Sequence, residues 1–224
     1  LVRFVLGMLA SALVHYLGCG ESAPPPGDIF AVVSALLLFA RGLKGEPVRT
    51  WPRPSCRITL FACVSKGGRM DWTVEKAVEL GAGRIVPVIS ERTVVRLDAV
   101  DGAAKAGRWT RVAEDAARQC QAAWLPEIFA PVSALESLGL VKEAAPVFVA
   151  ALSPDAIPLR QALAGHAAPP ARAGWFVGSE GDFTPDEMQE LLDAGAIPVS
   201  LGPHVLRAET ACLYGLCALS CAWL

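Results

Sequence analysis

The sequence holds few of the side chains from which metal sites are built. Its 224 residues include only three histidines, His15, His166 and His204, which lie far apart along the chain. The seven cysteines are an odd number, and no two of them form a Cys-x-x-Cys pair. Neither a zinc site nor a disulfide framework is therefore predicted, and we expect no metal.

Four of the cysteines lie in apolar runs: Cys63, Cys212, Cys217 and Cys221. A free cysteine in such surroundings behaves as a small hydrophobic residue. We interpret all four as buried side chains in a protein of the reducing cytosol.

Charged residues are also sparse, at 19% of the chain, whereas 53% is hydrophobic. This composition excludes a disordered chain and suffices for one large or two small folded domains. The net charge of −2 argues against a general polyanion binder. Residues 1–70 nevertheless carry eight Lys or Arg against three acids, a net of +5, which leaves −7 for the remainder. This asymmetry is typical of a nucleic-acid-facing part beside a catalytic part, although chance variation explains it equally well.

The N-terminal stretch Leu1–Leu17 is strongly apolar. It is short for a membrane span, and it contains Arg3 and His15. We therefore expect a buried element here rather than a signal peptide or a membrane helix.

From Ile58 onward, short apolar runs alternate with helical patterns, which predicts an α/β fold. Strands are predicted over residues 58–64, 84–89, 146–152, 175–177 and 197–201, with a short extended piece at 126–131. Helices are predicted over 70–80, 109–120, 184–194 and from 207, with single turns at 133–138 and 157–163. Strands separated by helices indicate a parallel sheet with right-handed crossovers and helices on both faces.

The stretch from Trp175 to Ala218 carries the clearest functional pattern. Its first strand ends at a glycine-rich turn, residues 178–181, where backbone amides can approach a ligand closely. Thr184, Pro185 and Glu187 then form the capping signature of a helix. A second strand ends at Gly202-Pro203. Two such turns after two strands of one sheet mark the place where open α/β sheets bind ligands.

Two motifs in this stretch resemble the C-terminal signature of the SPOUT methyltransferases, specifically the RsmE-type enzymes that methylate N3 of a uridine in 16S ribosomal RNA. The first is GSEGDFTPDE from residue 178, and the second is VSLGPHVLRAETA from residue 199. The family patterns are roughly G-P-E-G-G-[FW]-[ST] and S-L-G-x-[RN]-I-L-R-x-E-T-A. Residues 66–95 and 114–128 add two further matching blocks, so that the resemblance extends from about Ile58 to the C-terminus.

The resemblance implies a SPOUT methyltransferase domain over residues 58–224 with a C-terminal trefoil knot. It implies a small N-terminal RNA-binding domain over residues 1–57, a PUA-like β-barrel that is truncated or divergent here. It also implies S-adenosylmethionine as cofactor, ribosomal RNA or the small ribosomal subunit as partner, and a cytoplasmic homodimer.

The two turns and the strand before them are expected to hold this cofactor through backbone groups and apolar side chains. The expected cofactor-binding residues are Val177, Gly178, Glu180, Gly181, Ser200, Leu201, Gly202, Val205, Leu206 and Thr210. In the middle blocks, polar positions that match the family are expected to face the RNA: Lys66, Arg69, Arg92 and Gln119.

Arg207 lies at the start of the last helix, where a cation opposes the helix dipole. A substrate partner explains this placement, and a structural salt bridge is the alternative. We predict that Arg207 stabilises the negative charge that develops on the uracil oxygens when N3 loses its proton. Glu209 is the second catalytic candidate, although it and Thr210 are also expected to anchor the helix.

Three positions depart from the family pattern: Asp182 replaces a glycine, His204 an Arg or Asn, and Ala122 an Arg. A nearby sulfonium favours a carboxylate at position 182, but the side chain also obstructs close backbone approach. One alternative is therefore a degenerate relative that binds RNA or cofactor without transferring a methyl group. Another is a different nucleotide-binding α/β enzyme such as an NAD-dependent oxidoreductase, although its G-x-G-x-x-G pattern after the first strand is absent.

Overall fold

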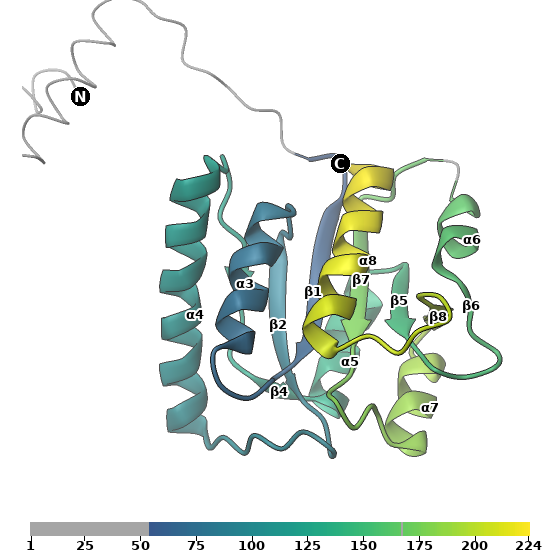
Figure 1. Cartoon of the computed structure of the whole chain (residues 1–224), viewed down its shortest axis with the longest axis horizontal. Coiled ribbons are helices and arrows are strands. Elements are labelled where there is room, and N and C mark those ends of the chain that lie inside the picture. The colour runs from purple at the N-terminus through teal and green to yellow at the C-terminus, as the bar shows by residue number, and fades with distance from the viewer. Residues whose placement is uncertain (1–53, 167) are drawn as a thin grey trace, which may run out of the picture. The chain divides into compact units, whose positions relative to one another are not determined.

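An all-parallel sheet is the framework of the chain in the computed structural model, which describes residues 54–166 and 168–224. The strand order is β3-β2-β1-β7-β5-β8-β6, and β4 extends the pairing of β2 (Figure 1). The strands are β1 (Arg57–Cys63), β2 (Arg84–Ile89), β3 (Glu127–Ile128), β4 (Val132–Ser133), β5 (Val147–Ala150), β6 (Ile157–Pro158), β7 (Arg172–Val177) and β8 (Ala196–Ser200). The helices are α3 (Arg69–Glu79), α4 (Ala99–Cys120), α5 (Ala134–Glu143), α6 (Leu159–Ala164), α7 (Pro185–Asp193) and α8 (Ala208–Trp223).

Helices cover both faces of the sheet, as predicted. Side chains along β1 alternate between the faces: Leu60 and Ala62 join one core cluster with α3, α4, α6 and α8, while Phe61 joins the other with α5 and α7. Figure 1 shows α4, α3 and α8 side by side on the near face. Because side chains of a strand point alternately up and down, burial of every β1 residue from Ile58 to Cys63 shows that both faces of the strand are covered. The predicted parallel α/β fold is thus confirmed.

The order of the strands differs from their order along the chain at one point that matters for the site. β8 follows β7 in sequence, but β5 lies between them and pairs with both. The chain then returns in α8, which packs on β7 and β1. The carboxyl ends of β7, β5 and β8 therefore lie next to one another at one edge of the sheet.

The boundaries of β2 and the start of α7 agree with the sequence patterns, whereas α4 is longer than predicted. It begins at Ala99 rather than Trp109. Asp98 caps it by accepting a hydrogen bond from the Asp101 amide at 2.8 Å. Glycines at positions 102 and 107 lower the helix propensity of this segment, but packing of α4 against α3 outweighs that weak local preference.

The helix α5 is also longer than predicted. The predicted helical turn at 133–138 is the full helix α5, which opens with a capping box between Ser133 and Glu136. The predicted turn at 157–163 divides into the short strand β6 and the helix α6. Pairing of β6 with β8 decides that division, and such pairing is not visible in local sequence.

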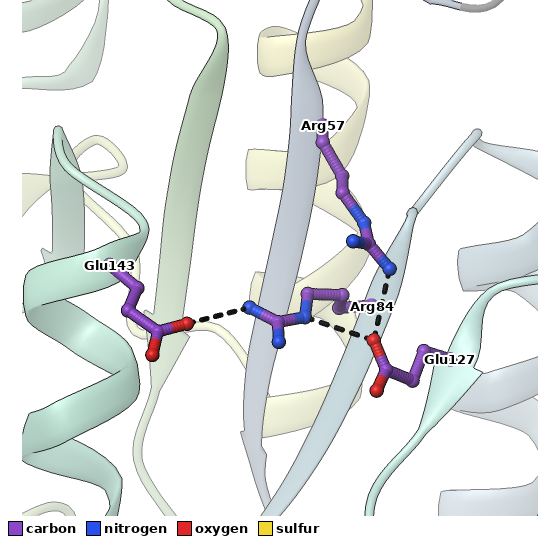
Figure 2. A network of polar contacts seen from close by, with 4 residues as sticks. All are labelled: Arg57, Arg84, Glu127 and Glu143. Atoms are coloured by element: carbon purple, nitrogen blue, oxygen red, sulfur yellow. Dashed lines mark hydrogen bonds and ion pairs between the residues drawn. The ribbon is translucent and has the colours of Figure 1, made fainter.

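A polar network links the amino ends of β1, β2 and β3 (Figure 2). Glu127 Oε2 on β3 accepts hydrogen bonds from Arg57 Nη2 at 3.0 Å and from Arg84 Nε at 3.2 Å. Arg84 Nη1 also donates to Glu143 Oε2 at the end of α5, at 3.4 Å. The network ties β1, β2, β3 and α5 together at the edge opposite the carboxyl ends.

The predicted N-terminal domain, residues 1–57, lies outside the described residues except for its last four. The described part contains no helix that is both long enough and apolar enough to span a bilayer.

Candidate functional site

A pocket of about 420 Å³ opens where three loops meet at the carboxyl ends of β5, β7 and β8. The loop after β5 contributes Ala150–Ser153, and the loop after β7 contributes Gly178, Ser179, Glu180 and Asp182. The loop after β8 contributes Ser200–Gly202 and His204–Ala208, and α8 adds Ala211. This volume lies within the range of small-molecule and cofactor sites, which is about 300–1,000 Å³.

The loop after β7 folds back tightly on itself. The Asp182 amide donates to the Ser179 carbonyl at 2.9 Å, and Asp182 has a left-handed backbone with φ of 58°. A Cβ on Gly178 would lie 2.8 Å from Asp182 Oδ1 and 3.3 Å from its Cα. A side chain at position 178 would therefore displace the Asp182 carboxylate and crowd the turn, which favours glycine there.

Two arginines hold this loop from outside the pocket. Arg92 Nη1 donates to the carbonyl oxygens of Gly181 at 3.0 Å and Phe183 at 3.1 Å. Arg69 Nη1 forms an ion pair with Glu180 Oε1 at 2.7 Å. Both arginines were predicted to face RNA, and in the structure both contact the loop that borders the pocket.

The loop after β8 combines an open glycine with apolar side chains. Gly202 has φ of 118°, which L side chains rarely adopt, and its amide donates to Ser200 Oγ at 3.4 Å. Leu201 and Leu206 pack partly against the core, whereas Val205 is 76% exposed. The wall thus offers apolar contacts next to backbone polar groups, as a nucleoside requires.

Arg207 lies on the wall of the pocket at the N-cap of α8. Within residues 54–166 and 168–224 its exposed side chain forms no hydrogen bond or ion pair, so the alternative of a structural salt bridge is not realised there. Glu209 follows in the first turn of α8, and its Oε2 is buried without a partner among the described residues. A buried carboxylate oxygen without a partner is costly, which marks Glu209 as a group that a ligand can satisfy.

The four cysteines that the sequence predicts to be buried fall into two classes. Cys63 and Cys212 are buried. Burial raises the pKa of the Cys63 thiol to about 12 and raises the pKa of Cys212 as well. The prediction that Cys217 and Cys221 are also buried is wrong, because both are exposed on α8. Apolar neighbours suggested burial, but α8 is apolar on its outer face too.

Comparison with known proteins places this geometry in a family. The model of the RNA methyltransferase domain matches residues 52–220. The chain belongs to the RNA methyltransferase domain family. The predicted family is thereby confirmed, and the matched region includes all three loops that line the pocket.

Individual relatives agree with the family assignment. The chain is 34% identical over 185 residues to ribosomal RNA small subunit methyltransferase E of Mycobacterium bovis, covering 80% of this chain and 69% of that protein. It is 29% identical over 167 residues to the enzyme of the same name from Bacillus subtilis, covering 73% of this chain and 65% of that protein. The chain thus spans about two thirds of the length of these relatives.

A solved structure agrees in fold. The Neisseria gonorrhoeae ribosomal RNA small subunit methyltransferase E, bound to S-adenosyl methionine, superposes with a TM-score of 0.67 at 31% identity. The match covers 77% of this chain and 68% of that one. The cofactor expected from the sequence is the one named for this neighbour.

Most of the cofactor residues expected for the methyltransferase domain meet at the pocket. Nine expected site residues line it: Val177, Gly178, Glu180, Ser200, Leu201, Gly202, Val205, Leu206 and Arg207. Gly181 and Thr210 do not line it: the Gly181 carbonyl accepts a hydrogen bond from Arg92 outside the pocket, and Thr210 is exposed on α8.

Two of the residues expected to face RNA lie away from the pocket wall. Lys66 is exposed in the loop after β1. Gln119 is exposed in the last turn of α4, next to Cys120 and Gln121, which line a second hollow at the amino ends of β1 and β2. Within one chain, the structure does not bring Gln119 to the pocket.

The loop after β5 is part of the site but was not predicted from the sequence. Residues Ala150–Ser153 line the pocket, but they contain no glycine and were interpreted as the end of a strand and a connection. The signal that could have found them is the strand order, since a strand between two ligand-binding strands contributes its own carboxyl end. Ser179 was missed as well, and its buried Oγ has no partner among the described residues.

Proposed function

We propose that the chain is the catalytic part of an S-adenosylmethionine-dependent methyltransferase that modifies N3 of a uridine in small-subunit ribosomal RNA in the cytoplasm. The observation that carries the proposal is the pocket at three strand ends, with Arg207 on its wall and no partner for that cation among residues 54–166 and 168–224. The RNA methyltransferase family and the relatives above support the reaction class and the RNA substrate.

The residues present fit the proposed cofactor. Leu201, Leu206 and Ala211 give an apolar wall for a base, and the left-handed turn at Gly202 exposes backbone groups. The buried, unpartnered Ser179 Oγ is a hydrogen-bonding group that a ligand would satisfy, since buried polar atoms nearly always have partners. When bound, the cofactor would supply a methyl group on a positively charged sulfonium.

Arg207 is proposed to act on the RNA base. Attack by a uracil N3 requires loss of its proton, and the resulting charge spreads to the two carbonyl oxygens. A fixed guanidinium stabilises that charge more in the transition state than in the bound substrate, which is the condition for faster turnover. Glu209, two residues further on, is proposed to orient this segment or the bound ligand through its buried oxygen.

Binding and methyl transfer test this proposal separately. We expect the protein to bind S-adenosylmethionine in calorimetry and to incorporate labelled methyl into small-subunit ribosomal RNA or the small subunit. Nucleoside mass spectrometry should then identify 3-methyluridine. Cofactor binding without methyl transfer would instead indicate the degenerate relative, and absence of both would contradict the proposal.

We also propose that the chain acts as a homodimer through α8. Four residues of α8 that follow helical spacing are exposed, and none of them is charged: Thr210, Tyr214, Cys217 and Cys221. An uncharged outer face on a helix that is already buried on its inner face is typical of a protein interface. Light scattering should show a dimer for the parent and a monomer for Tyr214→Arg. Val100→Arg, at a 78% exposed position on α4, is the matched control.

Two structural features implied by the resemblance remain proposals as well. The path of the chain from β7 past β5 to β8, and back in α8 over β7 and β1, supports the trefoil knot. An experimental structure traced through residues 147–224 would test it. The N-terminal segment, residues 1–57, is proposed to be the divergent PUA-like domain that contacts RNA.

A further inference from the structure

The loop after β7 carries a carboxylate at a backbone position that favours glycine. Asp182 has φ of 58°, in the left-handed region that few side chains adopt. Its Oδ1 accepts a hydrogen bond from the Phe183 amide at 2.9 Å, and its own amide donates to the Ser179 carbonyl at 2.9 Å. Together these bonds hold the carboxylate in one place above the turn.

Asp182 is part of the pocket wall, and its charge lacks an ion-pair partner within the described ranges 54–166 and 168–224. The other carboxylate of the loop, Glu180, is neutralised by Arg69 at 2.7 Å. Arg92 donates to the carbonyls of Gly181 and Phe183, on either side of Asp182, rather than to its carboxylate. The loop therefore presents one unneutralised negative charge to the pocket.

The same loop carries a second group that can bind a ligand, the hydroxyl of Ser179. Ser179 Oγ is buried and has no hydrogen-bond partner among the described residues, and Ser179 lines the pocket. Two arginines hold this loop, Asp182 has a left-handed backbone, and the Ser179 hydroxyl is buried without a partner among the described residues. The last two features cost stability, so together they indicate a loop built to bind a molecule.

Resting on the proposed function, we propose that Asp182 is a specificity determinant that makes the pocket prefer S-adenosylmethionine over the demethylated product, S-adenosylhomocysteine. The two molecules differ by one methyl group and by the positive charge of the sulfonium. A carboxylate on the wall stabilises the cationic molecule and gains no charge interaction from the neutral thioether. The pocket then binds the donor more tightly and releases the product more readily.

The decisive variant is Asp182→Asn. Asparagine tolerates a left-handed backbone, and its amide oxygen can keep the hydrogen bond from Phe183, so the change removes the charge and little else. Calorimetry should show that the Kd for S-adenosylmethionine rises about tenfold, the effect of one modest charge interaction, while the Kd for S-adenosylhomocysteine changes by less than about twofold. Added salt should lower the preference in the parent protein and leave it unchanged in the variant, because salt screens a charge interaction.

Two further variants complete the test. Asp182→Gly should lose the same preference while melting no earlier than the parent, because glycine suits the backbone at this position. Asp186→Asn removes an exposed carboxylate of α7 that lies outside the pocket wall, and it should keep the preference of the parent.

The possible failures are distinguishable. If Asp182→Asn weakens both ligands equally, the carboxylate holds a group that both share, such as a ribose hydroxyl or the amino group, and the inference is overturned. If it weakens neither ligand, the inference is overturned as well. If the parent protein binds neither ligand, the proposed function itself fails.

Discussion

At the scale of single residues, Arg207 is the side chain whose surroundings say most about function. It is a cation at the N-cap of α8, exposed on the pocket wall, and its side chain has no partner in the described part of the chain. Its position opposes the helix dipole, and no protein contact in the described ranges compensates for that cost. We propose that an anionic partner supplied by the substrate accounts for the placement.

We expect Arg207→Ala to lower the turnover of RNA methylation about a hundredfold, as for other fixed groups that stabilise developing charge. Affinity for S-adenosylmethionine should stay nearly unchanged, and Arg207→Lys should recover only part of the activity, because lysine lacks the planar fork. The matched control is Arg111→Ala, at an exposed position on α4. Methylation by Arg207→Ala at the parental rate, or early melting of that variant, would count against the assigned role.

The cysteines give a second prediction at this scale. Alkylation requires the thiolate, and with a pKa of about 12 for Cys63 only about one thiol in ten thousand is ionised at pH 8. Cys63 and Cys212 should therefore resist maleimide at pH 8 until the protein unfolds. Mass spectrometry after timed labelling measures this.

Cys217 and Cys221 should behave differently under the same treatment. They are exposed on α8, so they should react readily in dilute protein and become protected as the proposed dimer forms at higher concentration. Protection of Cys217 and Cys221 that does not depend on concentration would contradict the proposed interface.

At the scale of elements, α8 forms one wall of the pocket, because Arg207 is its N-cap and its first turns line the pocket. The helix packs on β1 and β7 in the middle of the sheet. Its contact with β7 depends on Gly215, since a Cβ there would lie 2.0 Å from the Trp175 ring. Trp175 Nε1 also donates to the Ala211 carbonyl at 3.1 Å. The backbone of α8 at Gly215 thus packs directly against the Trp175 ring of β7.

Gly215→Ala should destabilise the protein by about 1–3 kcal/mol, the usual cost of overpacking, and should weaken cofactor binding because α8 must move away from the sheet. Gly107→Ala in α4 is the matched control, since no atom lies within 4 Å of its added Cβ. That control should be neutral or should stabilise by up to about 1 kcal/mol. Urea denaturation distinguishes the two, and equal effects would mean that α8 packs more loosely than the structure shows.

At the scale of the whole molecule, the uneven charge can be partly resolved into contacts. Of the eight basic residues in positions 1–70, Arg57 is paired with Glu127 and Arg69 with Glu180. These two serve the sheet and the pocket loop, which leaves at most six for RNA phosphates. The RNA contact proposed for residues 1–70 therefore has fewer cations available than the composition of this segment suggests.

RNA affinity should fall with salt, with a log–log slope no steeper than about −4 for six phosphate contacts on single-stranded RNA. Affinity for S-adenosylmethionine should change far less over the same range. Fluorescence anisotropy with a labelled small-subunit RNA fragment, repeated from low to high salt, measures the first quantity. A flat response would mean that the N-terminal charge plays no part in binding RNA.

The sequence by itself determined the alternation of elements, most of their bounds and two of the three pocket loops. These features depend on interactions between neighbours along the chain: the period of apolar residues in β1 and β2, the capping box of Thr184 and Glu187, and the glycines that end helices and strands. Such interactions are visible in a window of a few residues. The family resemblance rested on the same local motifs.

Tertiary structure alone decided the rest, because the deciding contacts join residues far apart in the chain. The loop after β5 reaches the pocket only because β5 lies between β7 and β8. Arg92 and Arg69 hold the loop after β7 across separations of about ninety and more than a hundred residues, so their sequence neighbours could not reveal these contacts. Cys217 and Cys221 are exposed because α8 turns its other face to the sheet, and no local pattern separates two faces that both lack charge around these cysteines.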